Sequence, residues 1–234
     1  MSLFEQNVRN YWNYYLELES ELCQTKKYVE FNSENERTFS VEFLKLFQAI
    51  CSEIDVVGKY VASIVNKDFK IDRNTTIRNW WFEIQNQSGF CSNINRFQKG
   101  KSDGTLLHNA TVTNNCIGKS FSPWCNFKLE KNDNPKSNRK TRLANGCSTP
   151  QWWIDYNSVK HERTTENDSG SINFTKANLG NVCNSIAALY ILELFVLELS
   201  ADSNEQTERF FNESKLFVKN EFVSSVEIEE LFGK

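Results

Sequence analysis

Three features of the sequence predict an all-α fold. The 234 residues include only nine glycines and three prolines, too few for the many turns of an all-β sandwich. Apolar residues recur at helical spacing over two long segments, about residues 3–29 and 41–66. Residues 186–197 are apolar around almost the whole helical circumference, which is typical of a central buried helix. We therefore expect one domain over residues 1–234, built as an antiparallel helical bundle.

The N-terminal part, residues 1–86, is expected to supply the first helices of the bundle. The two long amphipathic segments are joined by a short polar stretch, which favours a helical hairpin. Ser40 stands directly before the second segment and is expected to cap it. After another polar break, the pattern predicts a shorter helix over residues 77–85.

Residues 87–149 interrupt the helical pattern with a long insertion rich in Ser, Asn, Lys and Gly. Its length is too great for a plain loop, so we expect irregular structure with short strands near residues 105–113 and 126–130. Residues 96–142 hold ten basic and three acidic side chains, a net charge of about +7. Cations interleaved with aromatic rings can hold phosphates and stack bases. The candidate RNA-binding cations are Arg139, Lys140 and Arg142. The alternative is a solvated insertion whose aromatic residues pin it to the bundle.

Residues 150–163 contain the densest group of candidate functional side chains. Proline at the first turn starts a predicted helix, in which Asn157 and His161 lie one turn apart on the same face. Histidine exchanges a proton near neutral pH, and neighbouring cations suit an anionic substrate. The candidate catalytic residues are Asn157, Lys160, His161 and Arg163. The alternatives are a structural histidine, a solvated charged face and tryptophans that belong to the core.

A longer pattern surrounds these candidates. It reads Trp152-Trp153-x-x-Tyr156-Asn157-x-x-Lys160-His161-x-Arg163, then Phe174-x-x-Ala177-Asn178-Leu179, then Ile186-Ala-Ala-Leu-Tyr-Ile-Leu192. This pattern resembles the C-terminal half of a HEPN-type domain. The HEPN signature is an arginine, a polar residue, three further residues and a histidine. Asn157 matches the polar residue and His161 matches the histidine. Tyr156 stands where the family has the arginine that holds the scissile phosphate.

The resemblance implies an all-α bundle, a homodimer that joins two motifs, and a role in toxin–antitoxin, anti-phage defence or stress systems. Many HEPN proteins are metal-independent endoribonucleases. In that case His161 would act as general base or acid, Asn157 would orient it, and Lys160 and Arg163 would neutralise charge on the phosphate.

The second function that the resemblance implies is a catalytically inactive module that binds RNA or a protein partner, such as an antitoxin or a defence protein. Trp153 and Tyr156 are then candidate RNA contacts, beside the cations of the insertion. Tyr156 in place of arginine favours this second function, whereas Asn157 and His161 favour the first. Both remain open on the sequence.

The C-terminal part contains a buried helix and a tail. The apolar helix is expected over about residues 176–199, capped by Asn173 or Thr175, and closes the unit formed by residues 150–199. Because Glu193 lies inside the apolar run, we expect a core helix rather than a membrane span. The acidic tail, residues 200–234, is expected to be helical near residues 205–220 and to dock on the bundle.

Cofactors and metals are not predicted. The seven cysteines form no Cys-x-x-Cys pair, the chain has two histidines, and no Gly-rich phosphate loop is present. Free thiols fit a reducing compartment, and the N-terminus shows no signal peptide, so we expect a cytoplasmic protein. The glutamates Glu17, Glu19 and Glu21 are compatible with an acid/base or metal site, but a solvated helix face is the simpler interpretation.

Overall fold

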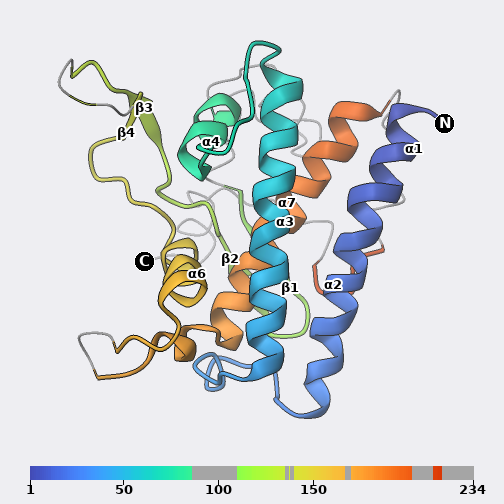
Figure 1. Ribbon diagram of the computed structural model, residues 1–234. Helices are drawn as coiled ribbons and strands as arrows, with labels where there is room; N and C mark the ends of the chain where they lie inside the picture. The colour runs from blue at the N-terminus through green and yellow to red at the C-terminus, as the bar shows by residue number, and fades with distance from the viewer. Residues whose placement is uncertain (86–109, 135–136, 138–139, 167–169, 202–212, 218–234) are drawn as a thin grey trace, which may run out of the picture.

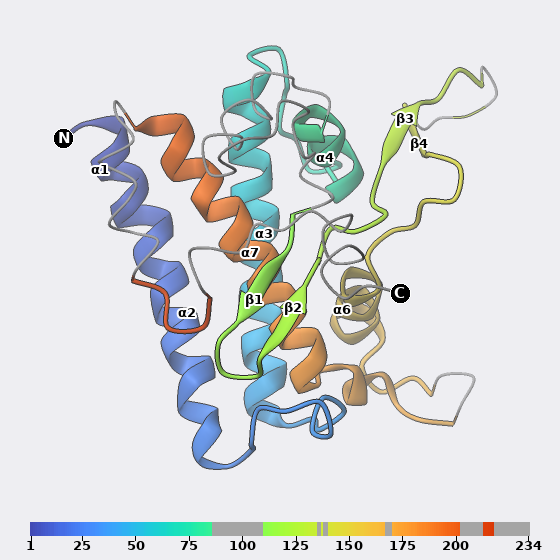
Figure 2. The same cartoon turned by 180° about the vertical axis from the view of Figure 1, so that it is seen from behind.

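The computed structural model describes residues 1–85, 110–134, 137, 140–166, 170–201 and 213–217. Its helical elements are α1 (Leu3–Asn7), the π-helical turn η1 (Val8–Trp12), α2 (Asn13–Gln24), η2 (Thr25–Lys27), α3 (Val41–Val65), α4 (Ile77–Gln85), α6 (Gln151–Glu162), η4 (Asn173–Lys176) and α7 (Leu179–Ser200). Its strands are β1 (Val112–Asn114), β2 (Lys119–Phe121), β3 (Leu129–Lys131) and β4 (Thr141–Leu143). Helices α2, α3 and α7 run side by side, with α6 and the β3–β4 hairpin on one flank (Figures 1 and 2).

The N-terminal helices follow the predicted segments. Ser2 begins α1 with a capping box, in which its side chain accepts from the Glu5 backbone and its backbone donates to the Glu5 carboxylate. Helical dihedrals continue through η1 into α2, so α1, η1 and α2 form one rod with a π-turn inside it. Ser40 caps α3 as expected, since its Oγ accepts from the Phe43 amide at 3.0 Å.

Helix α7 is the central element of the bundle. Its most extensive packing is against α3, and its residues from Leu179 to Leu197 form a window that is 83% buried inside the fold. This window is long and apolar enough to cross a membrane, but such burial is the pattern of a core helix in a soluble protein. The predicted cap was wrong: Asn178, not Asn173 or Thr175, caps α7 by accepting from the Asn181 amide. Asn173 instead lies in η4, where its side-chain amide donates to the Glu162 carbonyl of α6.

The all-α prediction was wrong, because the described residues also contain two antiparallel two-stranded sheets. In one, Val112 pairs with Phe121, and in the other, Leu129 pairs with Leu143. Each strand has only three residues, which is too short for an alternating pattern to stand out in the sequence. The predicted strands overlap β1 and β3 only in part, and residues 105–109 lie outside the described residues.

Aromatic residues anchor the insertion to the bundle. The Trp81 indole of α4 donates to the Phe127 carbonyl and stacks on Trp124 with ring centroids 4.5 Å apart. Gln85 exchanges two hydrogen bonds with the Leu129 backbone, so it pairs with β3 as a strand residue would. On the other side, the Trp152 indole donates to the Pro123 carbonyl at 2.8 Å. These contacts place Trp124 and Phe127 in the core, where their rings stabilise the fold.

Gly58 marks a close approach of α3 to this aromatic cluster. A Cβ at Gly58 would lie 2.6 Å from the Trp80 ring, which is fully buried and cannot easily move. We expect Gly58→Ala to lower the free energy of unfolding by about 1–3 kcal/mol through overpacking, although alanine is the better helix former. Urea denaturation measures this, with Ser52→Ala on the exposed side of α3 as the control. A Gly58→Ala variant as stable as the parent would contradict the packing.

The C-terminal strap, residues 213–217, is the described part of the tail. It forms no helix, so the predicted tail helix was wrong over these residues, and the rest of that prediction lies outside the described residues. The expected docking is confirmed for the strap, because Leu216 and Phe217 are buried. The Asn115 amide donates to the Leu216 carbonyl at 2.8 Å, and Phe217 stacks on Tyr190 of α7. The strap thus packs against α7 and the β1–β2 hairpin.

Candidate functional site

Helix α6 carries the candidate catalytic residues and is held at both ends. Its N-cap is Pro150, whose carbonyl accepts from the Trp153 and Ile154 amides. Its last carbonyls are also paired: Asn173 Nδ2 donates to Glu162 O, and the Phe174 amide donates to the next carbonyl along the chain. The turn that carries His161 is therefore fixed by η4.

Tyr156 occupies the position of the signature arginine and lies in the core. Its side chain is only 4% exposed and packs edge-on against Phe47 of α3. Burial, with smaller effects from Cys51 and Asp55, raises the pKa of Tyr156 to about 12. The phenol is therefore neutral at physiological pH and supplies no positive charge. Lys160 Nζ lies over the ring at 5.4 Å, which places an exposed cation above this position.

Asn157 and Trp153 are also largely committed to the helix and the core. The Asn157 amide nitrogen donates to the Trp153 carbonyl at 2.8 Å, one turn earlier in α6. The Trp153 ring is 9% exposed and contacts Trp152 and Tyr156. Little of either predicted RNA-binding ring, Trp153 or Tyr156, is open to a base.

Three of the candidate residues of α6 are exposed. Lys160 and His161 lie in its last turn and Arg163 follows directly, so the two cations Lys160 and Arg163 sit at the negative end of the helix dipole. In the described part of the chain, no hydrogen bond or ion pair joins any two of them. The structure thus presents a short cationic edge rather than a linked catalytic group.

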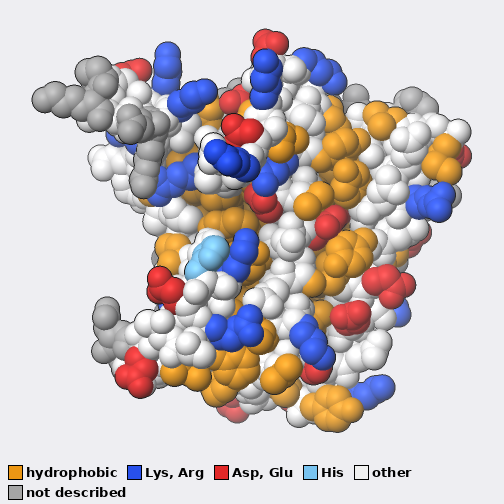
Figure 3. All heavy atoms as spheres, viewed as in Figure 1, with side chains coloured by type: hydrophobic (Ala, Val, Ile, Leu, Met, Phe, Trp, Pro, Cys, Tyr) orange, Lys and Arg blue, Asp and Glu red, His pale blue; other side chains and the backbone are white. Residues whose placement is uncertain are grey.

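Two of the three predicted RNA-binding cations of the insertion lie at the β3–β4 hairpin. Arg142 lies on β4 and pairs with Glu130 of β3 at 2.7 Å, while Lys140 is exposed just before that strand. Arg139 lies outside the described residues. The hairpin projects from the bundle on the same flank as α6 (Figures 1 and 2). On the face seen in Figure 3, Lys and Arg side chains alternate with acidic ones, so no continuous basic surface covers it.

A polar network that the sequence did not predict fixes the orientation of α6. Asp155 accepts from Asn181 of α7 at 3.1 Å and forms an ion pair with Lys176 at 3.4 Å. Lys176 also donates to Ser158. These contacts join residues on three different elements, and no local spacing in the sequence identifies such pairs. They tie the face of α6 behind its cationic edge to η4 and α7.

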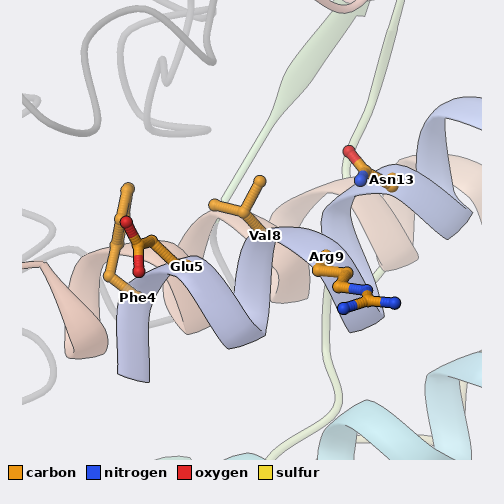
Figure 4. A pocket seen from close by; sticks show the side chains of 5 residues that line it. All are labelled: Phe4, Glu5, Val8, Arg9 and Asn13. Carbon is orange, nitrogen blue, oxygen red and sulfur yellow. The ribbon is translucent and has the colours of Figure 1, made fainter. Parts of the chain in front are cut away.

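One surface hollow among the described residues lies elsewhere. It is a shallow depression of about 140 Å³ on the rod formed by α1, η1 and α2, lined by Phe4, Glu5, Val8, Arg9 and Asn13 (Figure 4). Helix α1 stands on the opposite flank from α6 in both views (Figures 1 and 2). The depression is therefore separate from the predicted site.

Neither metal clusters nor relatives add to this picture. Within the described ranges, no group of three or more His, Cys, Asp or Glu side chains is arranged to hold a metal ion. No family model matches the chain, and neither the curated proteins nor the solved structures include a significant match.

Proposed function

We propose that this chain is a HEPN-like RNA-binding module without nuclease activity of its own. The observation that carries this proposal is Tyr156, a buried neutral phenol at the position where the HEPN signature places a cation on the scissile phosphate. Asn157, which would orient the phosphate or the histidine, donates its amide to its own helix. A nuclease of this type needs a cation at the position of Tyr156 and a free Asn157 amide beside the reacting phosphate, because its rate depends on preorganised charge there.

Binding requires less than catalysis, and the cations it needs are exposed. Lys160 and Arg163 lie beside His161 at the edge of α6, and on the same flank Lys140 precedes β4 and Arg142, paired with Glu130, lies on it. A nucleic acid strand along this flank would place phosphates against both groups. The net charge of −3 and the mixed surface make this a local contact, which fits recognition of a short RNA segment.

The biological setting is part of the same proposal. The module acts in the cytoplasm in a defence, toxin or stress system, and the cationic edges of two copies of α6 face each other in a homodimer. An antitoxin or defence-system protein is the expected protein partner. Light scattering at tens of micromolar tests the pairing, and a monomer there would remove the dimeric part of the proposal.

The first test is incubation of the purified chain with total RNA in EDTA, beside His161→Ala. We expect no cleavage by either protein, because neither Tyr156 nor Asn157 can support the reaction. Metal-independent cleavage by the parent that His161→Ala abolishes would instead establish a ribonuclease and overturn the proposal.

The second test measures affinity for a short single-stranded RNA by fluorescence anisotropy over a range of salt. Removing one phosphate contact is expected to weaken binding about three- to tenfold and to reduce the salt slope by about one. We expect this for Lys160→Ala and Arg163→Ala. The control is Lys45→Ala, another exposed lysine, which is paired with Glu42. Equal losses in all three variants would mean that binding is nonspecific.

A further inference from the structure

An exposed aromatic ring lies beside the cationic edge of α6. Phe39 precedes the Ser40 cap of α3 and is 46% exposed, and its ring meets Phe174 of η4 with centroids 5.6 Å apart. The Phe174 amide donates to the Arg163 carbonyl at 3.0 Å. The ring pair is therefore joined directly to the residue that ends the cationic edge. In Figure 3, apolar side chains gather at the lower end of the face, with Lys or Arg side chains directly above them.

Backbone contacts hold Phe39 in place on both sides. Phe39 forms an isolated antiparallel bridge with Asn178, and the Thr38 carbonyl accepts from the Leu179 amide at 2.9 Å. The next residue, Ser40, caps α3 through its side chain. The segment that presents the ring is thus ordered before any ligand binds, so binding costs little further conformational entropy there.

The geometry of the pair leaves a face of the Phe39 ring uncovered by its neighbour. The two ring planes cross at 82°, and in such an edge-to-face pair each ring keeps at least one face that its partner does not cover. Phe174 packs partly against the core, whereas Phe39 is exposed. The two rings that the sequence assigned to RNA, Trp153 and Tyr156, are buried. Of these four rings, Phe39 is the one that can receive a base.

Cations and an exposed ring are the two features that hold single-stranded nucleic acid. The cations contact the phosphates, and the ring stacks on a base. On this part of the surface the cations are Lys160 and Arg163, because Lys176 of η4 pairs with Asp155 and donates to Ser158. A single exposed hydrophobic side chain is ordinary on a protein surface. The position of Phe39 beside the cationic edge is what indicates a binding role.

We propose that Phe39 stacks on an unpaired base of an RNA strand whose phosphates contact Lys160 and Arg163. The ligand of the α6 flank is then single-stranded RNA, because bases in a duplex already stack on one another and offer no free face. This inference rests on the proposed RNA binding and adds to it the ring that recognises the base. Phe39 acts by stacking, so it selects unpaired bases without selecting a particular sequence.

The experiment measures the affinity of the full chain for a short single-stranded RNA and for an abasic strand of the same length, by fluorescence anisotropy. Phe39→Leu keeps an apolar side chain against Phe174 and removes the ring. We expect it to weaken binding of the RNA about tenfold with an unchanged salt slope, because stacking is lost and no phosphate contact changes. The parent and Phe39→Leu are expected to bind the abasic strand equally. Phe39→Tyr, which keeps an aromatic face, should bind the RNA like the parent.

The matched control is Tyr14→Leu, which removes a 42% exposed ring from α2 and should leave both affinities unchanged. If Phe39→Leu binds the RNA as tightly as the parent while Lys160→Ala weakens binding, the stacking role is overturned and the proposed RNA binding stands. Equal losses of Phe39→Leu on the RNA and the abasic strand would show that the ring supports the fold and contacts no base, which also overturns the inference. A parent that binds neither strand would overturn both proposals.

Discussion

Glu193→Leu is expected to raise the free energy of unfolding at neutral and alkaline pH. Glu193 lies in the middle of α7 with no exposed surface, and within the described residues neither carboxyl oxygen has a hydrogen-bond partner. The charged and titratable groups that face it are Glu53 of α3 and Tyr11 of η1. Burial, and then the negative charge of Glu53, raise the pKa of the Glu193 carboxyl well above its ordinary value. The folded protein therefore holds this carboxyl protonated and neutral.

The sign of the pH dependence follows from where the proton is bound. Above pH 4.5, the usual pKa of glutamate, the unfolded chain loses the proton while the folded chain keeps it. The free energy of unfolding then falls as pH rises, by about 1.4 kcal/mol per pH unit, until the pKa of the folded state is reached. Leucine removes both the titration and the unpaired polar group. The partly buried Glu53, whose pKa is also raised, leaves a weaker slope of the same sign in the variant.

Urea unfolding of the parent and Glu193→Leu from pH 5 to 9 measures this difference. The two curves are expected to diverge as pH rises, with the variant more stable at the alkaline end. Glu193→Gln, which keeps the shape and loses the titration, is expected to show the flatter slope without the full gain in stability. Glu21→Gln, at an exposed position of α2, is the control and should follow the parent. Parallel curves for the parent and Glu193→Leu would show that the carboxyl does not hold a proton in the fold.

The long helices were predictable because their apolar stripes repeat over many turns. Residues 3–29, 41–66 and 77–85 were expected to be helical, and α3 and α4 match their segments within one residue. The π-turn η1 was not predicted; its extra residue shifts the buried stripe, so that Trp12 is fully buried and Tyr11 only partly. The hairpins of the insertion are fixed by contacts with residues distant in the sequence, such as Gln85 with Leu129. Local sequence patterns do not predict such contacts.

The sequence predicted that the candidate site lies on a helix, but it did not predict how the side chains of the site are arranged. The spacing of Asn157 and His161 follows from helical geometry alone. Whether Tyr156 faces solvent or core depends on where α3 packs, and the structure places it against Phe47. The acidic residues show the same limit. Among Glu17, Glu19 and Glu21, a solvated face was the expected interpretation, yet Glu19 is only 2% exposed.

Glu19→Ala has the second large expected effect, because Glu19 is the anchor of the strap. Its carboxylate accepts from the Lys215 amide at 2.8 Å, from the Leu216 amide at 3.2 Å and from the Ser214 hydroxyl. It also accepts from the Tyr15 phenol at 2.7 Å, within α2. Alanine would leave these donors, of which the Tyr15 phenol and the Leu216 amide are buried, without this acceptor. An unpaired buried donor costs about 1–3 kcal/mol, so we expect Glu19→Ala to lower the free energy of unfolding by about 3 kcal/mol or more.

The loss is expected to be localised at the strap, which gives it a second readout. Lys215 is exposed but lies between contacts that hold its backbone, so trypsin cleaves after it slowly while the strap is docked. Glu19→Ala should speed this cleavage before the rest of the chain is attacked, and Glu19→Gln should have a smaller effect because one acceptor oxygen remains. Glu17→Ala, on the exposed side of the same helix, is the matched control. If Glu19→Ala unfolds at the parent's urea concentration and protects Lys215 equally, the carboxylate does not hold the strap.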